Sequence, residues 1–234
     1  MGRLILTGDV HGELLKRFSY KNDGRLRELT KDDSVMVLGD FGCPFGVNHP
    51  QYEQHYKNSD NYQLQWMQSR PWKTTFALLG NHDDRDALRQ MNVVEMQGYM
   101  FPHWGNIIYI DKPCILDIAG NHCLLIPGAK SHDAKFRTMG IDMWPDEGID
   151  IIAAIDTLIG HRYDYFDLIL THDVPSGNLY HFMPTVNEEF LEYLAGTLNY
   201  GAWYHGHMHN QYCKLERDIT CLYGDIIDPN DPKW

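Results

Sequence analysis

Five short polar motifs, each following an apolar run, constrain the fold of this chain more than any other feature. They occupy residues 8–12 (Gly-Asp-Val-His-Gly), 39–42 (Gly-Asp-Phe-Gly), 80–83 (Gly-Asn-His-Asp), 171–173 (Thr-His-Asp) and 206–209 (Gly-His-Met-His). A single His-x-His pair says little, because histidines are common at strand ends. Five such motifs predict strands whose polar ends meet at one rim of a sheet, where α/β proteins bind ligands.

The apolar runs also predict the fold class. Strands are expected at residues 3–7, 34–38, 74–79, 107–109, 114–118, 123–126, 166–171, 203–205, 212–215 and 220–223. Helices are expected at residues 14–29 (interrupted at 22–24), 62–68, 84–91, 148–160 and 187–194, the fourth with isoleucines at helical spacing and the last capped by Asn187. Strand–helix alternation followed by hairpins predicts an α/β (α+β) chain with mixed sheets flanked by helices.

Length and composition predict one domain. The 234 residues suffice for a single domain over 1–234, and the segment 43–60, rich in Pro, Gly, His and Tyr, is expected to be a loop insertion. The formal net charge of -12 disfavours long nucleic acid as a partner without excluding it, and also disfavours an anionic membrane.

The cysteines and the apolar runs predict a location. Five cysteines without a Cys-x-x-Cys spacing are expected to be reduced thiols, not a disulfide framework or a zinc cluster. The run at residues 4–6 is too short for a signal peptide, and no run reaches the roughly 20 apolar residues of a membrane span. We therefore expect a cytoplasmic protein; its oligomeric state is left open.

The polar motifs bring together side chains that bind metals. Seven of them are candidate ligands, comprising two carboxylates, one amide and four imidazoles: Asp9, His11, Asp40, Asn81, His172, His207 and His209. This mixture suits Mn, Fe, Zn or Ni better than Ca, which prefers oxygen ligands alone. Seven ligands fit two ions about 3.5–4 Å apart that share one carboxylate. Asp40, which lies between glycines, is the expected bridge.

Together the five motifs resemble those of the calcineurin-like metallophosphoesterases, in the same order and over most of the chain. The resemblance implies a four-layer αββα sandwich and two divalent ions, manganese first, with Fe, Zn, Ni or Mg as alternatives. It implies that Asp9, His11, Asp40 and His209 hold one ion and that Asp40, Asn81, His172 and His207 hold the other. It also implies that His82 is a catalytic acid supported by Asp83.

Two further features refine the resemblance. Residues 128–133 (Gly-Ala-Lys-Ser-His-Asp) resemble a subgroup of small bacterial and phage-type phosphoesterases. The second motif lacks the arginine that grips phosphate in the Ser/Thr protein phosphatases, so Arg85 and Arg137 are the candidate substrate-binding residues. The alternative is that Arg85 forms a surface salt bridge and Arg137 anchors a loop.

The predicted function is hydrolysis of a phosphate ester, either a phosphomonoester or a small phosphodiester. Metal-activated hydroxide would attack phosphorus, and His82 would protonate the leaving group. A nuclease or cyclic-nucleotide phosphodiesterase is one alternative. A non-catalytic scaffold of the same fold is another, which the complete set of ligands disfavours.

Overall fold

The computed structural model describes most of the chain. The described residues are 2–43, 53–85, 88, 100–103, 105–180, 183–210, 213–215, 217–231 and 233–234, with no side chains described at 53–59 and 100–103. Most of the helix expected at 84–91, and residues 44–52 of the expected loop insertion, therefore lie outside the described residues.

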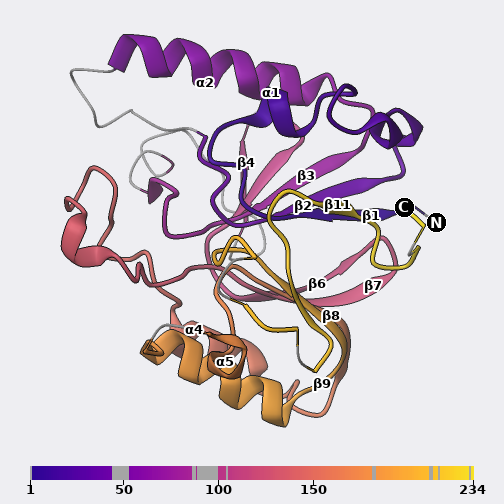
Figure 1. Cartoon of the computed structure of the whole chain (residues 1–234). Coiled ribbons are helices and arrows are strands. Elements are labelled where there is room, and N and C mark those ends of the chain that lie inside the picture. The colour runs from indigo at the N-terminus through magenta and orange to yellow at the C-terminus, as the bar shows by residue number, and fades with distance from the viewer. Residues whose placement is uncertain are drawn as a thin grey trace.

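Two mixed sheets form the centre of the fold (Figure 1). The first has the strand order β11-β1-β2-β3-β5-β4. Its strands are β1 (Leu4–Thr7), β2 (Ser34–Leu38), β3 (Thr74–Leu78), β4 (Met100–His103), β5 (Ile107–Ile110) and β11 (Ile226–Ile227). Strands β1, β2, β3 and β5 run parallel, and the two edge strands β4 and β11 run antiparallel to their neighbours.

The second sheet has the order β10-β9-β8-β7-β6. It consists of β6 (Cys114–Ile118), β7 (Asn121–Ile126), β8 (Tyr165–Thr171), β9 (Asn199–His205) and β10 (Ile219–Cys221). Here β7 to β10 pair in parallel, and only β6 is antiparallel, because it joins β7 in a tight hairpin.

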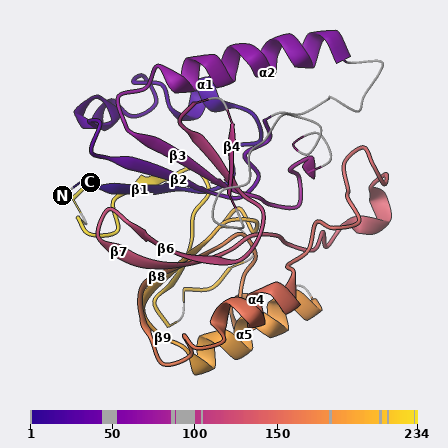
Figure 2. The same ribbon diagram turned by 180° about the vertical axis from the view of Figure 1, so that it is seen from behind.

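Helices cover the outer face of each sheet (Figures 1 and 2). Helices α1 (Leu14–Arg17) and α2 (Glu53–Gln68) lie over the first sheet, and α4 (Ile151–Leu158) and α5 (Val186–Thr197) over the second. Short 3₁₀ turns lie at Gly24–Glu28, Ala134–Phe136 and Ser176–Asn178. The arrangement confirms the expected four-layer αββα sandwich.

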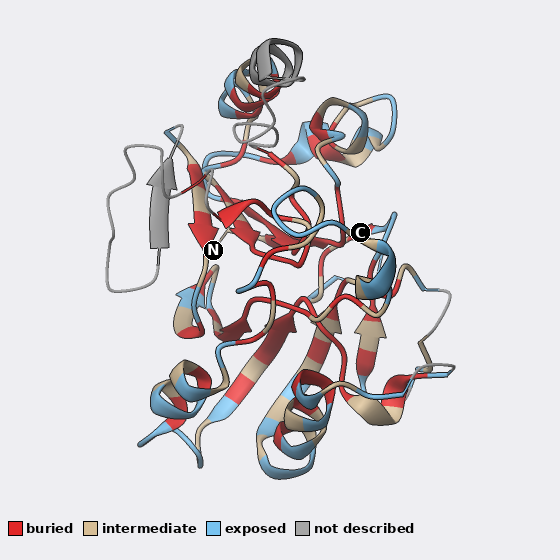
Figure 3. Cartoon of the chain, turned by 90° about the vertical axis from the view of Figure 1, so that its left-hand side faces the viewer, coloured by how far each residue is buried: buried red, intermediate tan, exposed pale blue. Residues whose placement is uncertain are grey.

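Three apolar layers hold the four structural layers together, and the burial pattern follows them (Figure 3). Under α1 and α2 lie Leu14, Phe18, Leu64 and Trp72, between the sheets lie Leu6, Met36, Leu125 and Leu170, and under α4 and α5 lie Leu158, Phe166, Leu191 and Trp203. Residues alternate between the two faces of each strand, so a central strand such as β2 or β8 contributes to two of these layers.

Several helix boundaries differ from the sequence-based expectation. Helix α2 begins at Glu53, so the second half of the expected loop insertion is helical. The helix expected at 14–29 stops at Arg17 and resumes only as a 3₁₀ turn, because Asp23 accepts from the backbone N–H of Arg25 and starts a new turn. Helix α5 is capped by Thr185 in a capping box with Glu188, and not by Asn187.

Two predictions failed for tertiary reasons. Of the strand expected at 212–215, the described residues 213–215 do not form one; Cys213 instead makes an isolated bridge to Leu179. Helix α4 forms as expected, but Ile152, Ile155 and Ile159 are 74%, 50% and 70% exposed, because the helix packs through Ala154 and Leu158 instead. Helical spacing predicted the helix correctly but did not predict which face would be buried.

Candidate metal centre

The parallel strands of both sheets end at one edge of the sandwich. Register pairs Leu38 with Leu78 in the first sheet and Thr171 with His205 in the second, so the loops that follow these strands start at matched levels. The loops after β1, β2 and β3 carry four predicted ligands, and the loops after β8 and β9 carry the other three. The predicted rim is therefore made by both sheets.

The backbone at this rim is unusual. Positive φ angles are uncommon for residues other than glycine, yet His11, Asp40, His207 and His209 have φ of 50°, 47°, 65° and 49°. Non-glycine residues in this conformation store strain and gather at functional sites. Four of the predicted ligands thus have a backbone conformation that is locally unfavourable and that the surrounding structure must stabilise.

The motif glycines make room for the ligands. A Cβ atom at Gly39 would lie 1.9 Å from His172 Nδ1, and one at Gly80 would lie 2.1 Å from Asp40 Oδ1. A Cβ atom at Gly206 would lie 2.4 Å from Asp9 Oδ1. Each glycine therefore permits a ligand from a different loop to approach the backbone.

One group of candidate ligands consists of Asp9, His11 and His209, whose ligand atoms lie within 4.8 Å of one another. Asp9 Oδ2 is 2.9 Å from His209 Nε2, and the Nε2 atoms of His11 and His209 are 3.2 Å apart. Asp9 is buried, whereas both imidazoles are partly exposed. Nitrogen lone pairs and a carboxylate oxygen that converge in this way suit a cation.

A second group surrounds the buried His172. Its Nε2 atom lies 3.0 Å from Asn81 Oδ1 and 3.3 Å from Asp40 Oδ1. The other ring nitrogen, Nδ1, lies 2.8 Å from the carbonyl oxygen of Leu38. A proton on Nδ1 donated to that carbonyl leaves Nε2 as the ligand atom, as is usual for metal-bound histidines.

Electrostatics at His172 show that the site attracts positive charge. Burial by itself disfavours the charged imidazolium, but the carboxylates of Asp40 and Asp9 outweigh it and raise the pKa of His172 to about 10. Burial likewise opposes the charge of Asp40, yet His172 holds the pKa of Asp40 well below its usual range. Without a metal, the proton on His172 provides the positive charge that these carboxylates require.

The seventh ligand, His207, has a ring nitrogen with no partner. Its Nε2 atom is buried and makes no hydrogen bond. Burial, followed by His172, lowers the pKa of His207 well below its ordinary value, so the ring is neutral at pH 7 and Nε2 is available to a cation. An unpartnered buried nitrogen among carboxylates and imidazoles fits a metal centre, and the residues present match the ions expected for this fold.

Asn81 is oriented by residues outside the five motifs. Its side-chain N–H donates to Ser131 Oγ at 2.9 Å, and Ser131 Oγ donates to Glu147 Oε2 at 3.1 Å. These two hydrogen bonds orient the side chain of Asn81 so that its amide oxygen faces His172. Ser131 lies in the stretch 128–133, which resembles a subgroup of the family, but the sequence does not predict its contact with Asn81.

Asp83 lies between two of the loops that carry predicted ligands. Asp83 is buried and accepts hydrogen bonds from the backbone N–H groups of Gly42 at 2.7 Å and Gly80 at 2.8 Å. It makes no described hydrogen bond to His82. Asp83 therefore joins the loop after β2 to the loop after β3 and holds Asp40 beside Asn81, and direct support of His82 as a catalytic acid is not observed.

The two candidate arginines differ. Arg85 is 3% exposed and donates from Nε to Asp111 at 2.8 Å and from Nη1 to the Gly80 carbonyl at 3.0 Å. This pair is buried, unlike the surface salt bridge considered as the alternative, and it leaves the predicted substrate contact of Arg85 unsupported. Arg137, by contrast, reaches the rim.

Arg137 contacts the predicted acid His82. Its Nη1 atom lies 2.9 Å from His82 Nε2 and 3.2 Å from His82 Nδ1. Because the two ring nitrogens point their lone pairs in different directions, an atom this close to both lies over the ring face. Arg137 also donates to the Asp142 carbonyl at 3.1 Å, so it anchors its loop as well as approaching His82.

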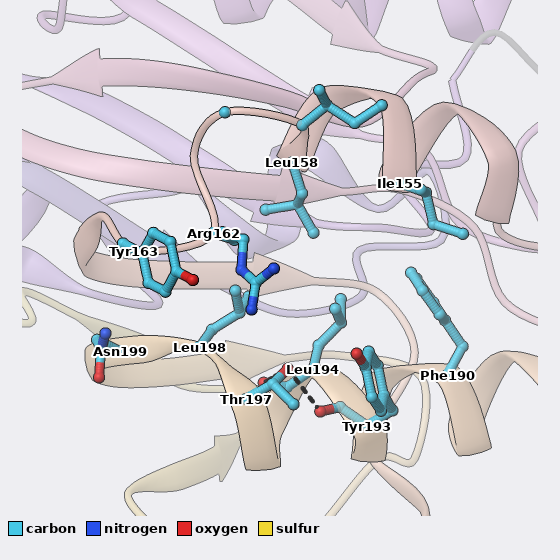
Figure 4. Close-up of a pocket in the computed structure, with 12 residues that line it drawn as sticks. Ile155, Leu158, Arg162, Tyr163, Phe190, Tyr193, Leu194, Thr197, Leu198 and Asn199 are labelled. Atoms are coloured by element: carbon cyan, nitrogen blue, oxygen red, sulfur yellow. Dashed lines mark hydrogen bonds between the residues drawn. The ribbon is translucent and has the colours of Figure 1, made fainter.

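A hollow elsewhere on the surface lacks this chemistry. It has a volume of about 700 Å³ and lies between α4 and α5, where Ile155, Phe190 and Tyr193 line it (Figure 4). None of its lining residues is a carboxylate, a histidine or a cysteine. The rim, and not this apolar hollow, is therefore the candidate functional site.

Comparison with known proteins agrees with this geometry. The sequence profile of the calcineurin-like phosphoesterases matches residues 2–211, nearly the whole chain, and the protein belongs to that family. Membership places the chain among metal-dependent phosphoester hydrolases. No curated protein matches the sequence significantly.

Two solved structures are similar in outline. A protein of unknown function from Aquifex aeolicus is 14% identical in sequence, with a TM-score of 0.38. The alignment covers 86% of this chain and 88% of the Aquifex chain. The phosphopantetheinyl hydrolase PptH of Mycobacterium tuberculosis is 13% identical in sequence, with a TM-score of 0.42. The alignment covers 95% of this chain and 88% of the PptH chain. In the described part of this chain, no helix has the length and apolar character to cross a membrane.

Proposed function

We propose that this protein hydrolyses a small phosphate ester, a monoester or a compact diester, at a centre for two divalent ions. The observation that supports this most directly is the convergence of seven ligand side chains from both sheets on one rim, with His207 Nε2 buried and unpartnered. Asp9, His11, Asp40 and His209 would hold one ion, and Asp40, Asn81, His172 and His207 the other.

Asp40 is the proposed shared ligand. Its Oδ1 atom faces His172 Nε2 at 3.3 Å, and its Oδ2 atom faces His11 Nδ1 at 4.0 Å, so its two oxygens point towards different groups of ligands. Asp9 also contacts both groups, since its Oδ1 atom lies 3.5 Å from His172 Nδ1. That nitrogen already bonds to the Leu38 carbonyl, however, so Asp40 faces the available nitrogen of His172.

The bound ions would supply Lewis-acid chemistry that activates water and neutralises phosphoryl oxygens. His82 would supply a proton to the leaving oxygen. In the ion-free protein, burial and then Arg137 lower the pKa of His82, against the opposing effect of Asp40. The negative charge of a phosphate ester bound beside His82 would favour the protonated imidazole.

Arg137 is the proposed phosphate-binding residue. It lies beside His82, and a guanidinium can bind two phosphoryl oxygens at once. A phosphate held there would lie next to the proposed acid. Small esters are favoured over phosphoproteins because the second motif has no arginine, and over long nucleic acid because the formal net charge is -12.

A substrate panel tests the proposal. Purified protein loaded with Mn²⁺ should bind two ions at this centre and hydrolyse nitrophenyl phosphate or bis-nitrophenyl phosphate. The ratio of the two rates assigns monoester or diester preference. Failure to turn over either ester with two ions bound would contradict hydrolysis and favour the scaffold alternative. Turnover of a phosphoprotein at the 10⁴–10⁸ M⁻¹s⁻¹ typical of enzymes on good substrates would contradict the small-ester assignment.

A further inference from the structure

A second group of metal-binding side chains lies next to the rim. His205, Cys213 and Cys221, here called the Cys–His cluster, each offer a ligand atom, and these atoms lie within 4.8 Å of one another. Cys213 and Cys221 follow His205 at intervals of eight residues, without the short Cys-x-x-Cys spacing that identifies many zinc sites from sequence.

The backbone fixes all three positions. Cys221 on β10 is the direct register partner of His205 on β9, and neighbouring strands lie about 4.8 Å apart, so the two side chains are adjacent on one face. Cys213 is held by its bridge to Leu179 and by the hydrogen bond from Lys214 N to the Asn178 carbonyl at 2.9 Å. The cluster therefore rests on two strands and a braced loop.

His205 is oriented as a ligand. Its Nδ1 atom lies 2.8 Å from the Gly206 carbonyl oxygen, which accepts the ring proton and leaves the lone pair on Nε2, where it accepts from the Cys213 thiol in the ion-free protein. That lone-pair nitrogen is 3.7 Å from Cys213 Sγ. Tetrahedral zinc, with Zn–S near 2.3 Å and Zn–N near 2.0–2.1 Å, would separate the two atoms by about 3.6 Å. The observed separation of His205 Nε2 and Cys213 Sγ is therefore close to the separation that a shared zinc ion requires.

The surroundings favour a soft or borderline cation. Val174, Leu179 and Met208 pack around the cluster, with His205 and Cys221 buried and Cys213 partly exposed. Two sulfur ligands and one imidazole select zinc and chemically similar ions over Mn²⁺ or Mg²⁺. The exposed side of Cys213 gives an ion a way in.

We infer that His205, Cys213 and Cys221 form a binding site for one zinc-like divalent ion, separate from the two-ion centre at the rim. Three protein ligands leave the fourth tetrahedral position to water. The ion would join β9, β10 and the loop at Cys213 next to Gly206, the residue that precedes His207 and His209. It would thereby stiffen the loop that carries two ligands of the rim.

The other cysteines show what distinguishes this cluster. Cys123 is fully buried in the apolar layer between the sheets, where its thiol reaches the Asn121 carbonyl. Cys43 Sγ lies 3.6 Å from Asp60 Oδ1. Among the described residues, His205, Cys213 and Cys221 are the only group of three possible metal ligands that contains thiols. Cys123 is therefore a suitable control thiol.

Cobalt(II) tests the inference, because cobalt bound to thiolates shows a sulfur-to-metal charge-transfer band in the near ultraviolet. Carboxylate and imidazole ligands alone do not produce this band, so it reports the Cys–His cluster separately from the rim. The protein would first be reduced fully and stripped of metal, and then titrated with Co²⁺. Because the rim also binds divalent ions, we expect the band to reach the intensity of one thiolate-bound Co²⁺ per chain within three equivalents of added Co²⁺, and to disappear when excess Zn²⁺ replaces the cobalt.

Variants assign the band. Cys213→Ser and Cys221→Ser should each weaken it or abolish it, whereas Cys123→Ser should keep it at full intensity. Absence of the band in fully reduced wild-type protein saturated with cobalt would overturn the inference, and so would a band lost in Cys123→Ser but kept in Cys213→Ser. The wild-type titration needs no variant to fold, and its result is independent of whether the rim hydrolyses any ester.

Discussion

The rim and the Cys–His cluster meet at Gly206 but are built differently. The rim has four of the proposed ligands on loops of the first sheet and three on loops of the second, with carboxylates, an amide and imidazoles as donors. The cluster takes all three of its side chains from β9, β10 and the loop between them, and two of its donors are sulfur. The two sites are therefore expected to prefer different ions because their donor atoms differ, although β9 carries His205 and leads into the loop with His207 and His209.

The largest expected effect breaks the rim and spares the cluster. Asp40→Asn removes the charge of the proposed shared ligand, so both rim ions should bind more weakly. Loss of a group that only orients a ligand weakens metal binding roughly 10–100-fold, and we expect a larger loss of affinity here. Elemental analysis should show less than two Mn²⁺ per chain, and ester hydrolysis should fall with it. The cobalt–sulfur band should persist.

Asp33→Asn is the matched control for Asp40→Asn. Asp33 is a buried aspartate just before β2, at the opposite end of that strand from Asp40, where it accepts from Arg3 N at 2.7 Å. This variant should lose stability but keep its metal stoichiometry. Two tightly held ions in Asp40→Asn would contradict the shared-ligand assignment.

The next effect separates catalysis from metal binding within the rim. His82→Ala should retain both ions yet lose roughly 10²–10⁴ in turnover of an ester with a poor leaving group. The loss should be smaller for a nitrophenyl ester, because nitrophenolate leaves readily without a proton. Steady-state kinetics on both esters, with metal content measured alongside, checks this. Equal losses would instead give His82 a role in binding phosphate.

A smaller effect is expected from the residues that orient Asn81. Ser131→Ala removes the acceptor of the Asn81 side-chain N–H and should weaken metal binding or activity roughly 10–100-fold. Ser176→Ala, in a 3₁₀ turn outside the rim, is a control of the same chemistry. Isothermal titration with Mn²⁺ measures the change. Unaltered affinity and activity in Ser131→Ala would show that Asn81 needs no such support.

The last prediction concerns stability in the absence of metal. The folded pKa of His172 is raised to about 10, above the ordinary value of 6.5, so the protonated form stabilises the fold fully below pH 6.5 and this stabilisation is lost as the pH rises through 10. Metal-free protein should therefore lose thermal stability between pH 6.5 and 10 more steeply than His172→Gln does. Parallel melting curves for the two proteins would contradict the charge balance described at the rim.

The sequence could predict that the candidate ligands lie together at one rim, because they occur in polar motifs that directly follow apolar strands. Strand ends are visible from local patterns, and parallel strands bring their ends together without further information. The four layers followed from the resemblance to the family, and the profile match over residues 2–211 agrees with it.

Contacts made across the fold were not predictable in the same way. Nothing in the sequence pairs Arg85 with Asp111, its buried partner 26 residues away. The exposed Ile152 of α4 and the assembly of Cys213 and Cys221 with His205 depend on how helices and strands pack. Local spacing does not contain that information.

Because the rim takes its ligands from both sheets, bound ions would act as a cross-link between the two halves of the sandwich. The apolar layer between the sheets resists separation but has no directional bonds to fix how one sheet lies over the other. Ligand bonds to Asp40 on one side and to His172 on the other would fix that alignment. Each ion at 100 times its Kd would add about 2.7 kcal/mol to the free energy of unfolding. The supply of metal would then set how long the folded chain persists, as well as how fast it turns over substrate.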